Sequence, residues 1–395
     1  MRKASRLQLL GTETAFEVLA EVKRLEAQGR DIISFAIGEP DFATPQNIKD
    51  AGCQAIQEDH THYSPSAGLM ELREAIAEYV SATRKISVSP EEVVVTPGAK
   101  PIIFHGILAC VDPGDEVIYP NPGFPIYESV IRFVGGVPVP LPLREERDFR
   151  FDIAELQSLV TPRTKMIIIN SPHNPTGGIL GPKELEAVAE LALTHDLWVL
   201  SDEIYSRLVF EGEFLSITAI PEMKERTIIL DGFSKTYAMT GWRLGYGVMN
   251  RSLAQDVARL VTNCESCTAT FTQVAGIEAL RGPQDGAEAM REEFLRRRNL
   301  IVKLLNEIDG ISCRMPQGAF YVFPNVTEAC RKLGLKDARE FQRKALYEAN
   351  VAVLSRTSFG SKGGWETQEY VRLSYATSME QIKAGIERLR KFVEG

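Results

Sequence analysis

The sequence predicts an α/β protein with one large, mainly parallel β-sheet domain and a smaller α+β domain. Short apolar, β-rich runs recur through its middle part, and helical patterns alternate with several of them. Each of these runs ends in a cluster of polar, glycine or proline residues. The rhythm breaks near Gly282, where a long, charge-rich helical stretch follows. A chain of 395 residues is long enough for two such domains.

The strand signal comes from apolar runs bounded by turn residues. We expect strands at 93–95, 116–119, 166–169, 198–200 and 227–230. After Gly181, Pro182 suits the first turn of a helix, and apolar residues then repeat at helical spacing through Ala192. Because strands and helices alternate in this way, we expect a mainly parallel sheet with helices on both faces.

The domain boundaries follow from where this alternation stops. We assign residues 46–285 to the large domain and 286–395 to a small C-terminal domain, which carries the strand-like segments GAFYVF and VRLSYA. The N-terminal segment, 1–45, is expected to pack with the small domain. A helix is predicted from about residue 287 to 306, and we interpret its arginine triplet, 296–298, as a solvated face rather than a binding patch.

Charge and hydropathy exclude several classes of protein. The formal net charge of −8 provides no basic field of the kind that binds nucleic acid. No apolar run reaches membrane-spanning length, and the N-terminus lacks the apolar stretch and cleavage site of a signal peptide. We therefore expect a cytoplasmic protein with neither nucleic acid nor membrane as a partner.

The cysteines and histidines give no metal signal. The six cysteines are scattered, which favours reduced thiols over a disulfide framework. Cys264 and Cys267 form a C-x-x-C, but no second pair or nearby histidine completes a tetrahedral site. The five histidines show no H-E-x-x-H spacing. No metal site is predicted.

Polar clusters follow the predicted strands at their carboxyl ends. They read TPGAK, PNPGF, NSPHNPTG, SDEIY and DGFSK in chain order. In an open α/β sheet, ligands bind outside the carboxyl ends of the strands. The five clusters therefore predict one common site.

Lys235 follows directly on one of these strands. Burial beside other cations would lower the pKa of its amine and make it a nucleophile toward a carbonyl group. Ser234, Thr236 and Arg243 are the residue types that hold a phosphate close to such a lysine. A surface lysine in a turn is the alternative interpretation of the same segment.

A second anion-binding signal lies in TPGAK. This motif places Ala99 and Lys100 at the start of the apolar helix PIIFHGILACV, whose free N–H groups and dipole favour an anion. The chain contains neither G-x-x-x-x-G-K-[ST] nor G-x-G-x-x-G, so the nucleotide-binding loops are excluded.

Asp202 in SDEIY sits at the mouth of the predicted sheet. A half-buried carboxylate there needs a cation, and a protonated pyridine nitrogen is one possible partner. The alternative is a helix N-cap, which Ser201 or Asp202 could supply.

Taken together, the motifs resemble a known family. GEPDF, YSPSAG with ELR, TPGAK, NSPHNPTG, SDEIY, GFSKTYAMTGWRLG and VRLSYA occur in the order found in class I/II, fold-type I pyridoxal-phosphate (PLP) aminotransferases. The likeness covers nearly the whole chain and is greatest to the bacterial aspartate-aminotransferase-like branch. It implies the PLP-dependent transferase fold of type I, PLP as cofactor and an aminotransferase of the EC 2.6.1 type.

The resemblance also implies roles for individual residues. Lys235 would hold the cofactor as a Schiff base and move the proton of the substrate, Asp202 would pair with the pyridine nitrogen, and Asn174 and Tyr205 would bond the phenolic oxygen of the ring. The phosphate would be held by Ala99, Lys100, Ser234 and Arg243, with the first two using backbone N–H groups. The substrate set would be Gly38, Phe124, Asn174 and Arg372, with Phe124 stacked on the ring.

Tyr63 resembles the tyrosine that reaches the phosphate of the neighbouring subunit, which implies a homodimer with shared active sites. The implied reaction is ping-pong transfer of an amino group from an L-amino acid to a 2-oxo acid. The donor stays open, because Phe124 stands where aspartate-preferring members commonly have tryptophan, and GTETAFEV departs from their proline–serine segment. An apolar, aromatic or alanine-like donor is equally compatible, with 2-oxoglutarate or pyruvate as acceptor.

Two other functions share this fold. One is a different PLP reaction, such as that of a β-lyase or a ring-forming synthase. The other is a ligand sensor without enzyme activity, although no helix-turn-helix precedes the motifs in this sequence.

Overall fold

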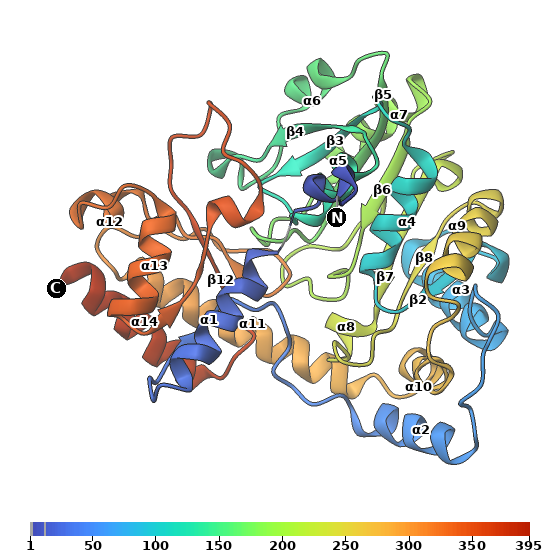
Figure 1. Ribbon diagram of the computed structural model, residues 1–395, viewed down its shortest axis with the longest axis horizontal. Helices are drawn as coiled ribbons and strands as arrows, with labels where there is room; N and C mark the ends of the chain where they lie inside the picture. Colours follow the sequence, from blue (N-terminus) through green and yellow to red (C-terminus); the bar gives the residue numbers. More distant parts are fainter. Residues whose placement is uncertain (1–2, 12) are drawn as a thin grey trace.

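A seven-stranded sheet forms the centre of the larger part of the molecule in the computed structural model, which describes residues 3–11 and 13–395 (Figure 1). The strand order is β2-β8-β7-β6-β5-β3-β4, and β8 alone in this sheet runs antiparallel to its neighbours. The strands are β2 (Val93–Thr96), β3 (Glu116–Asn121), β4 (Val137–Pro142), β5 (Thr164–Asn170), β6 (Trp198–Asp202), β7 (Thr227–Gly232) and β8 (Gly245–Val248). The predicted mainly parallel sheet is confirmed.

The five predicted strands are all present, and two further strands were missed. Strand β4 alternates valine or leucine with proline, and it lies at the edge of the sheet, where a missing N–H is tolerated. Strand β8 reads GYGV, and glycine weakens a strand signal. A Cβ at Gly245 would collide with the backbone of Ala99, so close packing at the start of the next helix requires this glycine.

Helices cover both faces of the sheet. On one face, apolar side chains of α4 and α9 pack against Met166, Ile168 and Leu200 of the central strands. On the other face, α3 and α10 cover β2, β7 and β8, while α6 and α7 cover β3, β5 and β6. These helices are α2 (Gln46–Gln57), α3 (Met70–Arg84), α4 (Lys100–Cys110), α5 (Ile126–Phe133), α6 (Ile153–Leu159), α7 (Pro182–Thr194), α8 (Phe233–Thr236), α9 (Arg251–Cys264) and α10 (Thr270–Arg281).

The long helix α11 (Asp285–Asn306) leads from the large sheet to the smaller α+β part (Figure 1). There a three-stranded sheet has the order β11-β12-β9, with antiparallel pairing throughout. The C-terminal elements of this smaller part are β9 (Tyr321–Val322), α12 (Thr327–Lys332), α13 (Ala338–Glu348), β10 (Val351–Ala352), β11 (Leu354–Ser355), β12 (Val371–Ser374) and α14 (Met379–Glu394).

The two ends of the chain meet in this smaller part. Strand β1 (Ile33–Ser34) pairs in parallel with β10, so that Ile33 lies opposite Val351. Helix α1 (Thr14–Glu26) packs its Val18, Val22 and Leu25 into a cluster with residues of the C-terminal quarter, among them Leu354. The domain boundaries at residues 45 and 285 stay predictions.

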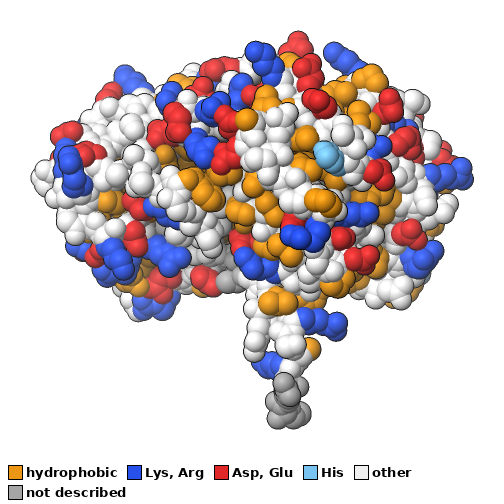
Figure 2. Space-filling model, turned by 90° about the horizontal axis from the view of Figure 1, so that it is seen from above, with side chains coloured by type: hydrophobic (Ala, Val, Ile, Leu, Met, Phe, Trp, Pro, Cys, Tyr) orange, Lys and Arg blue, Asp and Glu red, His pale blue; other side chains and the backbone are white. Residues whose placement is uncertain are grey.

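Short 3-10 turns connect several elements. They are η1 (Ser5–Leu9), η2 (Pro90–Glu92), η3 (Glu145–Arg147), η4 (Ile217–Ala219), η5 (Lys224–Arg226) and η6 (Arg356–Phe359). The segment that contains η1 contacts α5 and projects from the body of the molecule (Figure 2). Among the residues that the structure describes, no helix is both long and apolar enough to cross a membrane.

The interpretation of the arginine triplet as a solvated face is wrong for two of its three members. Arg297 and Arg298 are buried, and only Arg296 points into solvent. Arg297 forms ion pairs with Asp41 and Glu293, and Arg298 donates from Nη1 to the carbonyl oxygen of Pro316 at 3.0 Å. A run of like charges does not reveal burial, because Asp41 and Pro316, which contact the two buried arginines, lie outside this helix.

Candidate active site

One cavity of about 480 Å³ opens at the carboxyl ends of the central strands. All the predicted site residues except Tyr63 and Thr236 line it, namely Gly38, Ala99, Lys100, Phe124, Asn174, Asp202, Tyr205, Ser234, Lys235, Arg243 and Arg372. They come from the ends of several strands and from the N-terminal and C-terminal segments. The structure therefore brings together side chains that the sequence separates by more than 300 positions, as Gly38 and Arg372 show.

Lys235 lies in α8, which begins immediately after β7. Its Nζ donates a 2.7 Å hydrogen bond to the carbonyl oxygen of Gly38 and lies 5.8 Å from the ring centre of Phe320. Burial lowers the pKa of its amine to about 8; Glu39 opposes this shift, whereas Arg372 is among the cations that reinforce it. A lysine with this pKa has a substantial neutral fraction near pH 7 to 8, as a nucleophile or base requires.

Asp202 ends β6 and faces the same cavity. Its Oδ2 accepts a 2.6 Å hydrogen bond from the hydroxyl of Tyr127, and its Oδ1 accepts from the backbone N–H of Ile204. Burial raises the pKa of this carboxyl to about 6, although the bond from Tyr127 acts in the opposite direction. No cation of the described residues pairs with Asp202, so a positively charged ligand group would complete its surroundings.

An anion-binding corner lies where β2 meets α4. Gly98 has a φ of +90°, and a Cβ there would collide with the Arg243 guanidinium, which packs directly against this turn. Ala99 precedes the first residue of α4, Lys100, and both residues line the cavity, where the free N–H groups of a helix start suit an anion. Arg243 is anchored by hydrogen bonds to the carbonyl oxygens of Pro97 and Thr240.

Arg372 of β12 enters the cavity from the smaller part of the molecule. It is buried, and its Nη1 donates to Oδ1 of Asn174 at 3.0 Å, while Nη2 donates to the carbonyl oxygen of Ala36. The buried Nε has no hydrogen-bond partner among the residues that the structure describes. Its guanidinium lies between the rings of Tyr321 and Phe359, at 4.4 and 4.8 Å from their centres.

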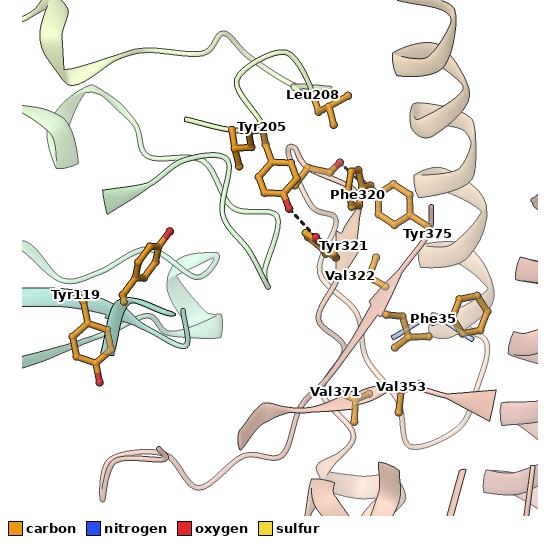
Figure 3. Packing of buried hydrophobic residues seen from close by; sticks show 14 of the residues in the cluster. Phe35, Tyr119, Tyr205, Leu208, Phe320, Tyr321, Val322, Val353, Val371 and Tyr375 are labelled. Carbon is orange, nitrogen blue, oxygen red and sulfur yellow. Dashed lines mark hydrogen bonds between the residues drawn. The ribbon is translucent and has the colours of Figure 1, made fainter. Parts of the chain in front are cut away.

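Two tyrosines join the large sheet to the smaller part at the cavity wall. The hydroxyls of Tyr205 and Tyr321 are 2.7 Å apart, and their rings meet edge to face (Figure 3). Tyr321 also lies against Gly38, where a Cβ would collide with its hydroxyl. A glycine at position 38 is therefore required for this contact.

A buried group of charges lies next to Asp202, although it does not line the cavity. Arg84 donates from Nε to Glu203 at 2.9 Å and from Nη2 to Asp231 at 2.5 Å. Ser206 joins the group through its hydroxyl, which accepts from Arg84 and donates to Asp231. Because Glu203 follows Asp202 directly and Asp231 lies on β7 ahead of Lys235, Arg84 ties together the two strand ends that carry these residues.

Sequence reasoning missed several residues of the site. Tyr127 lies in the first turn of α5, three positions after Phe124, and its closeness to the NPGF motif was the available signal. Tyr321 lies in GAFYVF, which was assigned to a strand without a role. Glu13 reaches the cavity from the N-terminal segment, which carries no strand-end signal at all.

Tyr63 lies outside the cavity, and 89% of its surface is exposed. This placement neither supports nor excludes its expected contact with a second subunit.

The sequence predicted no metal site. The described residues contain no group of three or more His, Cys, Asp or Glu side chains placed to hold a metal ion. Cys264 and Cys267 are free thiols, exposed and partly exposed.

The donor set fits PLP. The buried carboxylate of Asp202, which lacks a cation, suits the ring nitrogen, and the start of α4 suits the phosphate. Lys235, with its lowered pKa, suits the aldehyde, and Arg372, with a free buried N–H, suits a carboxylate of the substrate. The comparison with known families agrees, because the family described as aminotransferase class I and II matches residues 30–389. The chain belongs to this family.

Relatives of this aminotransferase match at least 95% of its length. An aspartate aminotransferase of Bacillus subtilis (strain 168) is 40% identical over 396 residues, covering 100% of this chain and 99% of the relative. An aromatic-amino-acid aminotransferase 2 of Thermococcus litoralis is 40% identical and covers 95% of this chain and 96% of the relative. The structure of the Thermus thermophilus aspartate aminotransferase with maleate superimposes with a TM-score of 0.92 at 37% identity, covering 99% and 100% of the two chains.

The comparisons confirm the expected fold, enzyme class and cofactor. The aminotransferase has the fold of type I PLP enzymes, and it depends on PLP. The names of its relatives include both aspartate and aromatic substrates. Membership of the family therefore does not select the donor.

Proposed function

We propose that this aminotransferase moves an amino group from an L-amino acid to a 2-oxo acid, with 2-oxoglutarate or pyruvate as acceptor. The observation that carries the proposal is that Lys235, Asp202 and Arg372 face one cavity. Lys235 suits the aldehyde of PLP, Asp202 suits its ring nitrogen, and Arg372 suits the α-carboxylate of an amino acid. The two substrates would use the cavity in turn, in a ping-pong sequence.

When bound, PLP supplies an electron sink that stabilises negative charge at the substrate Cα. Lys235 would hold the cofactor and then act as the base. Because its pKa is near 8, part of its amine is neutral at pH 7, and this form would take the proton from Cα and release it on the cofactor side. The hydrogen bond from its Nζ to the carbonyl oxygen of Gly38 holds the amine at the cavity wall.

Asp202 would accept the protonated ring nitrogen. A carboxylate with a pKa near 6 is charged at neutral pH, and the hydroxyl of Tyr127 fixes its orientation. Asn174 and Tyr205 would bond the phenolic oxygen of the ring. The amide of Asn174 is oriented by Arg372, and the hydroxyl of Tyr205 by Tyr321.

The phosphate would lie at the start of α4. The backbone N–H groups of Ala99 and Lys100, the hydroxyl of Ser234 and the guanidinium of Arg243 would hold it there. Phe124 would cover the ring; it packs edge to face on Tyr127, the partner of Asp202, with centres 5.8 Å apart.

Arg372 would clamp the α-carboxylate in a bidentate fork, next to Gly38. Fixing the carboxylate fixes which bond at Cα stands perpendicular to the cofactor ring, and so which bond breaks. The free Nε–H of Arg372 supports this role, because a buried donor without a protein partner is costly unless a ligand uses it.

We also propose a homodimer in which Tyr63 reaches the phosphate of the neighbouring subunit. Most of the surface of Tyr63 is exposed to solvent. The projecting N-terminal segment likewise exposes Leu7, Leu9 and Leu10, which is unfavourable in water unless another surface covers them (Figure 2). Both features favour a second copy of the chain as the covering surface.

The test is a single-turnover experiment with the PLP-loaded protein and individual amino acids. Conversion of the bound PLP absorbance to that of pyridoxamine phosphate, reversed by a 2-oxo acid, is the expected result. If none of the amino acids caused this conversion, the proposal would fail. Release of pyruvate and ammonia from a β-substituted amino acid, without conversion of the cofactor, would instead identify a β-lyase.

A further inference from the structure

Glu13 and Lys100 form an ion pair inside the cavity. Oε1 of Glu13 accepts a hydrogen bond from Nζ of Lys100, and both residues line the cavity wall. The two residues are 87 positions apart, so the N-terminal segment is folded over the start of α4. The side chain of Glu13 is mostly buried, with 15% exposed, whereas that of Lys100 is 43% exposed.

The surroundings of this pair are apolar. Nζ of Lys100 lies 5.5 Å from the ring centre of Phe124 and 5.9 Å from that of Phe16. Ala15 and Ile37 line the same cavity. This wall can therefore contact the side chain of an amino acid whose α-carboxylate is held by Arg372, and it offers that side chain hydrocarbon surface and one closed ion pair.

The charge of Glu13 decides what Lys100 offers to a ligand. An unpaired lysine at this wall would attract a second carboxylate of a substrate. With Glu13 in contact the pair is neutral, and an incoming carboxylate also meets the negative charge of Glu13 at short range. A neutral side chain encounters neither the attraction nor the repulsion.

The contact between the two residues can open. Glu13 precedes α1, but its side chain makes no capping hydrogen bond to that helix. Ion pairs with one partner partly in solvent are weak, so little is lost when Glu13 turns away. A dicarboxylic ligand that displaced Glu13 could then use Lys100 for itself.

We propose that Glu13 is a specificity-determining residue, which occupies Lys100 as a counter-ion and makes the site prefer neutral apolar or aromatic amino donors over dicarboxylic ones. A dicarboxylic 2-oxo acid such as 2-oxoglutarate binds only when its distal carboxylate replaces that of Glu13 on Lys100. The inference rests on the proposed function and names the donor class for the same site.

The first experiment compares kcat/KM for phenylalanine and for aspartate in the PLP-loaded enzyme. Wild type favours phenylalanine. Glu13→Gln keeps the size of the side chain but removes its charge, and it raises kcat/KM for aspartate tenfold or more, with the value for phenylalanine within about threefold. Glu17→Gln, at an exposed glutamate of α1, the helix that follows Glu13, is the matched control and leaves the ratio at the wild-type value. In the double variant Glu13→Gln/Lys100→Met the gain for aspartate is lost.

The second experiment needs no turnover. Succinate and butyrate have the same number of carbon atoms and differ by one carboxylate, so their Kd values in the PLP-loaded protein can be compared by absorbance titration. Glu13→Gln lowers the Kd for succinate tenfold or more and leaves the Kd for butyrate unchanged. Equal Kd values for succinate in wild type and Glu13→Gln overturn the inference. A wild-type protein that transaminates no amino acid overturns the proposed function, while the titration still decides the role of Glu13.

Discussion

Arg372 and Asn174, 198 residues apart in the chain, are joined by a 3.0 Å hydrogen bond from Nη1 to Oδ1. The bond links the proposed carboxylate clamp, which belongs to the small sheet, to the amide proposed to bond the cofactor ring, which follows β5. Substrate and cofactor would therefore be positioned by one connected pair of side chains, and a change at Arg372 should affect both to different degrees.

Arg372→Lys should damage substrate use far more than cofactor binding. A lysine cannot form the bidentate fork, and the loss of charged hydrogen bonds costs about 3 kcal/mol, or roughly a hundredfold in kcat/KM for an amino acid. The affinity for PLP should change by less than about tenfold, because only the orientation of Asn174 is lost. Steady-state kinetics and equilibrium dialysis with PLP measure the two effects. A fall in PLP affinity as large as the fall in kcat/KM would contradict the assigned role.

The attachment of PLP to the apoprotein should follow the titration of Lys235. Since burial lowers the pKa of its amine to about 8, the reactive neutral form increases as pH rises through 8, far below the usual value of 10.5. The rate constant of attachment, measured by stopped-flow absorbance, should therefore rise about tenfold per unit below pH 7 and level off above pH 9. Glu39→Gln removes a charge that raises this pKa, so its profile should shift to lower pH. An unshifted profile with a midpoint near 10 would refute the assignment.

Tyr127→Phe should weaken the binding of PLP. The variant removes a hydrogen bond to a buried carboxylate, worth about 2 kcal/mol, and so should raise the Kd for PLP roughly thirtyfold at pH 7. Because this bond lowers the pKa of Asp202, its loss also moves the decline of affinity at acidic pH to a higher pH. Tyr375→Phe is the control: it loses a buried bond to the carbonyl oxygen of Ala319, away from the cavity, and should leave the Kd unchanged.

Arg84→Met should reduce stability severely. It leaves Glu203 and Asp231 buried without their cation, which costs about 3 to 5 kcal/mol in the free energy of unfolding. Arg281→Met breaks an exposed pair with Glu78 and should cost about 1 kcal/mol or less. Urea unfolding of the two apoproteins gives both values. Similar losses in the two variants would show that the buried group does not hold the strand ends together.

Mixing one impaired and one inactive variant tests the shared site. Tyr63→Ala should lower PLP affinity by removing a contact in the neighbouring subunit, and Lys235→Ala should abolish turnover. If sites are shared, refolding a mixture of the two variants yields dimers in which one site has both native residues, and activity recovers to about one quarter of wild type for random assembly. Mixtures that stay at the level of Tyr63→Ala alone would speak against the shared arrangement.

The sequence located the parts of the fold that depend on local pattern. Strands β5 and β6 lie where apolar runs predicted them, because buried parallel strands are apolar throughout. Strand β8 escaped detection since Gly245 and Gly247 serve close packing against α4 rather than strand propensity.

The site was predictable where residues stand at strand ends, and unpredictable where they act through contacts made by the fold. Asp202 and Lys235 follow apolar runs directly, so their position had a local signal. Residues that reach the site from distant segments had no such signal, because Tyr127 contacts Asp202 across 75 residues and Glu13 contacts Lys100 across 87. Burial of Arg297 was missed for the same reason, as its partner Asp41 lies 256 residues away.

The pairing of β1 with β10 can form only late in the synthesis of this enzyme. A ribosome releases β1 early, but its partner emerges about 300 residues later, when most of the large sheet can already have folded. Gly38, whose carbonyl oxygen receives the bond from Lys235, lies four residues beyond the end of β1 in the same segment. A nascent chain therefore carries an unfinished catalytic centre until translation is nearly complete, and a truncated product that ends before Val351 would lack this pairing altogether.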